Sequence, residues 1–113
     1  MEISEKNVGN VNVISIGGRL DAYAANDLER KFDSLITAGH VRLVVDLSRL
    51  EYISSSGLRA LLTAIKRVKK EQGDVRLACL QASVKEVFDM AGFTQLFRLF
   101  DKEEEAVGSF EKG

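Results

Sequence analysis

The feature that most constrains the fold is a nearly continuous apolar run, rich in β-branched side chains, over residues 41–47. Such a run is typical of a central strand that is covered on both faces. Three consecutive serines, Ser54, Ser55 and Ser56, follow shortly after it, and an apolar stripe at helical spacing begins at Leu58. The stretch therefore predicts a strand, a turn, a hydroxyl-rich loop and a helix, in that order.

Periodicity predicts the remaining elements. Gly9 and Asn10 form a turn signal between two β-branched runs, which indicates a hairpin ending at Gly17 and Gly18. Helical spacing and extended runs then alternate, with helices from about residue 26 to 38, 58–70, 84–91 and from 101 onward, and strands at 75–80 and 96–100. This order predicts an α/β fold for one domain, residues 1–113, with a mixed, mostly parallel sheet of about five strands and about four helices.

Composition excludes several classes of protein. With 113 residues, 45% hydrophobic and 29% charged, the chain matches a soluble globular domain with one core. A net charge of -1 gives no bulk attraction to nucleic acid or to an anionic membrane, and the start lacks the pattern of a secretory signal, so we expect a cytoplasmic protein. One cysteine, Cys79, and one histidine, His40, cannot form an internal disulfide or a structural zinc site, and we expect no cofactor or metal.

The serines mark the candidate site. In open α/β sheets the loops at the carboxyl ends of the strands gather together, so residues 17–22 and 54–57 are expected to be neighbours. One serine is expected to cap the following helix. Capping alone does not explain three serines, nor Gly57 in the first turn, where glycine permits another surface to approach closely. The residues by themselves leave capping and a functional loop equally open.

Two segments carry a resemblance to a known family. Residues 52–59 read Tyr-Ile-Ser-Ser-Ser-Gly-Leu-Arg, after Asp46-Leu47-Ser48, and residues 17–21 read Gly-Gly-Arg-Leu-Asp. Together they resemble the signature of STAS-domain anti-sigma-factor antagonists, bacterial regulators of alternative sigma factors, and the resemblance covers nearly the whole chain. Many members of that family have Asp where this chain has Ser54.

The resemblance implies a partner switch. In the family, the serine two positions before the glycine is phosphorylated by an anti-sigma factor that is also a serine kinase, and this serine matches Ser55. The unmodified form would bind the kinase, which supplies ATP and magnesium, and free the sigma factor; a separate serine phosphatase would reset the cycle. The partner-binding residues are expected at the two loops and the start of the second helix: Gly18, Arg19, Asp21, Ser54, Ser56, Gly57 and Arg59.

The other polar residues of the region can each be explained by an ordinary structural role, and these explanations remain open. Arg59 lies four residues after Ser55 on the same side of the helix and is either an anion-steering group or a solvated arginine. Asp21 either caps the first helix, the better supported use, or completes the site. Asp46 is expected to fix a turn.

Other functions have less support from the sequence. A Ser-His hydrolase needs a base beside a serine, but His40 is expected at the opposite end of the sheet, so we expect no enzyme activity. The chain has no GxxxxGK[ST] loop for a nucleotide. The basic run near residues 66–70 is read as a helix end, and Cys79 as a small buried residue. The serious alternative lies within the fold: STAS-like domains also serve as non-phosphorylated subunits of transport or sensory complexes.

Overall fold

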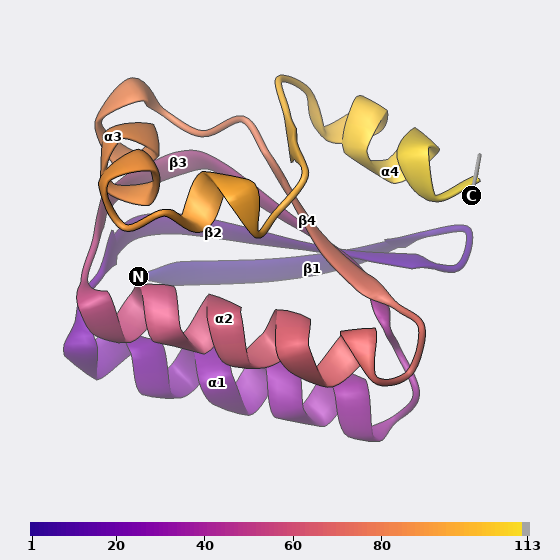
Figure 1. The fold of residues 1–113 in the computed structure, drawn as a ribbon. Helices are drawn as coiled ribbons and strands as arrows, with labels where there is room; N and C mark the ends of the chain where they lie inside the picture. Colours follow the sequence, from indigo (N-terminus) through magenta and orange to yellow (C-terminus); the bar gives the residue numbers. More distant parts are fainter. Residues whose placement is uncertain (112–113) are drawn as a thin grey trace.

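A computed structural model describes residues 1–111 (Figure 1). Within this part of the chain, strands and helices follow the predicted order. The elements are β1 (Glu2–Val8), β2 (Val11–Leu20), α1 (Ala22–Thr37), β3 (Arg42–Ile53), α2 (Ser55–Lys69), β4 (Asp74–Ala78), α3 (Ala82–Met90), the 3-10 turn η1 (Phe93–Gln95), β5 (Leu99–Phe100) and α4 (Glu103–Glu111).

The strands form one mixed sheet in the order β1-β2-β3-β4-β5. β1 pairs antiparallel with β2 through a tight turn, in which Val8 faces Val11, and this confirms the predicted hairpin. β2, β3, β4 and β5 run parallel to their neighbours. The carboxyl ends of β2 and β3 therefore lie at the same edge of the sheet, and the helices α1 and α2 both start there.

Helices cover both faces of the sheet, which explains why β3 is apolar on both sides. On one face, α1 and α2 run side by side (Figure 1), and with α3 they bury the larger core around Leu28, Phe32, Leu61 and Phe88. On the other face, α4 contributes to a smaller cluster. That cluster contains Val11, Val13, Val44, Ala78, Ala106, Val107 and Phe110.

Several predicted boundaries were wrong. β3 does not end at residue 47 but continues to Ile53, because its pairing with β2 resumes at Arg49, opposite Gly17, after an irregularity that contains Leu47 and Ser48, and Leu50 is again in the core. β2 likewise continues past the two glycines to Leu20. α1 starts at Ala22, earlier than its apolar stripe suggested.

The last third also differs in detail from the prediction. β4 spans Asp74–Ala78 instead of residues 75–80. The strand expected at residues 96–100 is reduced to Leu99–Phe100, and a 3-10 turn, Phe93–Gln95, precedes it. α3 and α4 lie close to their predicted positions, and within the described residues no helix is long and apolar enough to cross a membrane.

Candidate functional site

The loops that leave β2 and β3 are in contact, as the sequence predicts. The backbone N–H of Ser54 donates to the carbonyl oxygen of Leu20 at 2.9 Å. The Ser54 hydroxyl donates to the same oxygen at 3.0 Å. These two bonds fix the start of α2 against the end of β2 and bring the three serines beside the segment that contains Gly18, Arg19 and Asp21.

Ser54 is the residue that caps α2. Its φ and ψ of -87° and 169° are extended, and its hydroxyl oxygen accepts from the N–H of Gly57 at 3.1 Å. This hydroxyl therefore both donates and accepts within the protein. An ionised carboxylate at this position could accept from the helix but could not donate to Leu20.

Ser55 and Ser56 occupy the first turn of α2. Ser55 is exposed and Ser56 is half-buried. Among the described residues neither hydroxyl has a side-chain hydrogen bond, because the capping position is already filled by Ser54. The first-turn N–H groups and the positive end of the helix dipole lie at this point, so an anionic group on Ser55 would be stabilised locally.

Gly57 is buried, and the expected reason for it was wrong. A Cβ at this position would lie 2.8 Å from Leu20 Cγ and 2.9 Å from Ile53 Cγ1. The missing side chain therefore makes room for the protein's own core under α2 and not for an approaching surface. Gly57 determines how closely the start of α2 packs on β2 and β3, and through that the height of Ser55 above the sheet.

The segment before α1 presents three of the predicted residues. Gly18 has a φ of 84°, which glycine adopts without strain. The guanidinium of Arg19 lies 4.2 Å from the ring centre of Tyr52, its neighbour on β3. Asp21 caps α1, because its carboxylate accepts from the N–H of Ala24 at 2.8 Å. The capping interpretation of Asp21 is thereby confirmed.

Arg59 lies on α2, the helix that begins with Ser55, whereas Asp46 lies on β3. Arg59 is exposed, one turn beyond Ser55, and forms no ion pair within residues 1–111. Asp46 accepts from the N–H of Ser48 at 2.9 Å and so stabilises the irregular part of β3. Burial raises the pKa of Asp46, but hydrogen bonds with Ser48 and with the side chain of Glu103, together with the charge of Lys6, outweigh burial and hold the pKa below its usual range.

Two tyrosines near the serines were not among the predicted site residues. Tyr23, in the first turn of α1, is 85% exposed, and Tyr52 is 40% exposed beside Arg19. Aromatic residues are enriched at protein–protein interfaces, and these two rings adjoin the candidate residues. For Tyr23 the only available signal was its place between the cap Asp21 and the buried Ala24 and Ala25, on the outer side of the helix.

The other reactive groups lie apart from the serines. His40 precedes β3, at the sheet edge opposite to Ser55. Cys79 follows β4 and is half-buried, and burial raises the pKa of its thiol, so it is mainly protonated at neutral pH. Within the described residues there is no group of three His, Cys, Asp or Glu side chains that could hold a metal ion.

Comparison with known proteins agrees with this geometry. A family model described as the STAS domain matches residues 2–106. The chain is 32% identical over 111 residues, 98% of its length, to the Bordetella bronchiseptica protein BtrV, whose own designation as an anti-sigma factor antagonist is provisional, and it covers 96% of that protein.

Two solved structures have the same fold. The anti-sigma factor antagonist SpoIIAA in its unphosphorylated form superposes with a TM-score of 0.88 at 23% identity, over 99% of this chain and 98% of that one. The phosphorylated form of SpoIIAA from Bacillus gives a TM-score of 0.78 at 22% identity, over 96% and 99%. At these identities the likeness concerns the arrangement of strands and helices.

Proposed function

This chain belongs to the STAS domain family, and we propose that it is an anti-sigma-factor antagonist controlled by phosphorylation of Ser55. In this proposal the unmodified chain binds a serine-kinase anti-sigma factor and thereby frees a sigma factor. Transfer of phosphate to Ser55 ends that binding, and a serine phosphatase restores it. ATP and magnesium are bound by the kinase, and the chain itself catalyses nothing.

The observation that carries the proposal is the contrast between two adjacent serines. Ser54 has its hydroxyl engaged twice inside the protein, whereas Ser55 is exposed at the first position of α2. A kinase needs a hydroxyl that it can reach. Modification of that hydroxyl must also break no hydrogen bond that holds the helix in place. Ser55 meets both requirements and Ser54 meets neither.

A phosphate at Ser55 is expected to change binding and not folding. The modification adds a charge of about -1.5 to -2, and the start of a helix tolerates an anion well. A partner that packs closely over Ser55 would have to desolvate this charge without a compensating group, which weakens the complex. The two forms of the chain should therefore have nearly the same backbone and different partners.

The residues around Ser55 form the proposed binding surface. Gly18, Arg19 and Asp21 shape the neighbouring loop, Ser56 and Arg59 extend along α2, and Ser54 and Gly57 hold α2 in place from below. Tyr23 adds an exposed ring at the edge of this surface. A rigid helix start next to a rigid loop provides a surface of fixed shape, which favours discrimination between modified and unmodified forms.

The test uses the Ser55→Ala chain as bait in lysate of the source bacterium, followed by purification of each captured protein kinase. The kinase, ATP and magnesium are incubated with the original chain and with Ser55→Ala, and the phosphate is mapped by mass spectrometry. Phosphate on Ser55 alone supports the proposal. Phosphate on Ser54 or Ser56, or equal labelling of Ser55→Ala, overturns it.

The alternative is a STAS subunit of a transport or sensory complex that works without phosphorylation. In that case the bait would recover a membrane transporter or a sensory assembly, and the recovery would be the same with Ser55→Glu as with Ser55→Ala. Loss of recovery with Ser55→Glu argues for the switch, although one carboxylate only partly imitates a phosphate.

A further inference from the structure

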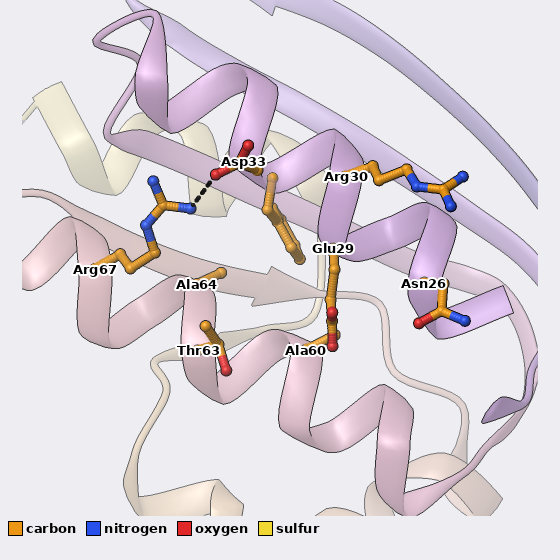
Figure 2. A pocket seen from close by; sticks show the side chains of 9 residues that line it. Asn26, Glu29, Arg30, Asp33, Ala60, Thr63, Ala64 and Arg67 are labelled. Carbon is orange, nitrogen blue, oxygen red and sulfur yellow. Dashed lines mark hydrogen bonds and ion pairs between the residues drawn. The ribbon is translucent and has the colours of Figure 1, made fainter. Parts of the chain in front are cut away.

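A groove of about 410 Å³ lies between α1 and α2, on the side of the helices away from the sheet (Figure 2). Its deepest residues are Phe32, Ala60 and Ala64, which are almost wholly buried. The two alanines are one turn apart on α2, and their short side chains leave the space between the helices unfilled. Asn26, Glu29 and Thr63 stand around this apolar floor.

The charged side chains at the rim of the groove differ in whether they form ion pairs. Asp33 and Arg67 form an ion pair at 2.9 Å across one end (Figure 2). Arg30 pairs with Asp27 at 3.5 Å and extends away from the groove. Glu29 has no ion-pair partner within residues 1–111, and its side chain runs from α1 toward Ala60 on α2. The groove therefore combines an apolar floor with four charged side chains whose charges balance, and among these four Glu29 alone forms no ion pair within residues 1–111.

This combination matches the side chain of a lysine or arginine. Such a side chain has an aliphatic stem, which can lie over Ala60 and Ala64, and a cationic end, which can reach Glu29. The amide oxygen of Asn26 and the hydroxyl of Thr63 are further acceptors for its N–H groups. An anion would be repelled by Glu29, and a purely apolar group would bury that carboxylate without a partner.

We propose that this groove receives a lysine or arginine side chain from the protein that docks at Ser55. The inference rests on the proposed function and names a second contact of the same partner. Ala60 follows Ser55 by five residues, a distance of about 7.5 Å along the helix axis. A stable interface needs about 800 Å² on each partner. A partner centred on Ser55 must therefore spread over neighbouring surface, and the groove is the next feature along α2.

The two contacts have different roles. The surface at Ser55 responds to phosphate, whereas the groove lies further along the helix and keeps its charge in both forms. The Glu29 contact thus selects among kinases by their basic residue, and Ser55 reports whether the selected kinase has acted.

The groove itself is tested by NMR titration of the ¹⁵N-labelled chain with the peptides acetyl-Leu-Lys-Leu-amide and acetyl-Leu-Glu-Leu-amide. The lysine peptide should shift the amide signals of Ala60, Thr63 and Ala64, and Glu29→Gln should remove these shifts. Glu86→Gln, an exposed glutamate on α3, is the matched control and should retain them. Equal shifts with both peptides, or none in the groove, overturn the proposal.

The partner is tested with the purified kinase that phosphorylates Ser55. Glu29→Gln should weaken its binding about three- to tenfold, as expected for loss of one partly exposed charge pair, and Glu29→Lys should weaken it further. Kinase binding that is unchanged in both variants overturns the groove proposal and leaves the Ser55 switch intact. If no kinase binds or labels the chain, the proposed function fails, and the peptide titration still decides the chemistry of the groove.

Discussion

Ser54 and Leu20 are 34 residues apart in the chain and are joined by two hydrogen bonds, since the Ser54 N–H and hydroxyl both donate to the Leu20 carbonyl oxygen. The same hydroxyl accepts from Gly57. One serine thus joins β2, β3 and α2 at a single point. The exposed Ser55 is the next residue, so its position is determined by this junction.

Replacing Ser54 by alanine should destabilise the protein. The variant loses the helix cap and one hydrogen bond to Leu20, which together are expected to cost about 1–3 kcal/mol of unfolding free energy. Urea denaturation followed by circular dichroism measures the change. Ser56→Ala is the control and should change the stability by less than about 0.5 kcal/mol, since Ser56 has no cap to lose. Equal stability of Ser54→Ala and the original chain would contradict the assigned junction.

Gly57→Ala should also destabilise, although alanine is the better helix former. The added methyl group would meet Leu20 and Ile53 below 3.0 Å, and both are buried. Overpacking of this kind costs about 1–3 kcal/mol. Gly108→Ala in α4 is the matched control, because its Cβ would meet nothing within 4 Å, and it should be neutral or stabilising by up to about 1 kcal/mol. Thermal melting of both variants compares the two sites, and a stabilised Gly57→Ala would show that the packing under α2 is looser than described.

Tyr23→Ala should weaken binding of the kinase and leave folding unchanged. The ring is 85% exposed in the free chain and can be covered by a partner, where tyrosines often contribute strongly. We expect a loss of about five- to thirtyfold in affinity, corresponding to about 1–2 kcal/mol. Surface plasmon resonance with the immobilised kinase provides the measurement. Val8→Ala, at the hairpin on the opposite edge of the sheet, should bind normally; a similar loss in both variants would place the partner elsewhere.

Asp46 should stabilise the protein at neutral pH and not in acid. Burial alone would raise the pKa of this carboxyl, but hydrogen bonds with Ser48 and with the side chain of Glu103, together with the charge of Lys6, hold the folded pKa below its usual value. A lowered pKa means that the charged form is favoured by folding. Its contribution is therefore complete above about pH 4 and disappears as the pH falls through the folded pKa.

The corresponding experiment compares Asp46→Asn with the original chain in urea denaturation between pH 7 and pH 2.5. The original chain should be more stable at pH 7, and the difference should shrink below about pH 4. A difference that stays constant over this range would mean that the charge of Asp46 does not contribute.

The order of the elements could be predicted because the spacing of apolar residues along the sequence reflects which residues are buried. The residues around Leu28 and Leu61 repeat at the helical period, and the run at 41–47 is buried on both faces. The continuation of β3 to Ile53 could not be predicted in this way. Ser48 and Arg49 read as a turn, and only the pairing with β2 determines that Ser48 lies in an irregularity and that Arg49, opposite Gly17, continues the same strand.

The site was predictable in part for a similar reason. Chain order placed Ser54 beside the end of β2, since parallel strands end at one edge, and the serine pattern identified the start of α2. The motif could not reveal that Gly57 faces Leu20 and Ile53, because this depends on the distance between α2 and the sheet. It also could not reveal the groove beside Ala60, since an alanine in a helix reads as an ordinary helix former until its neighbour on α1 is known.

The most direct test of the central claim is the dissociation constant of the complex with the kinase, measured for the unmodified chain and for the chain carrying phosphate on Ser55 alone. The phosphate should weaken the complex at least about tenfold, because a doubly charged group would be buried without a partner, while amide exchange through α2 stays the same. Equal affinity of the two forms would contradict the claim that Ser55 is the switch.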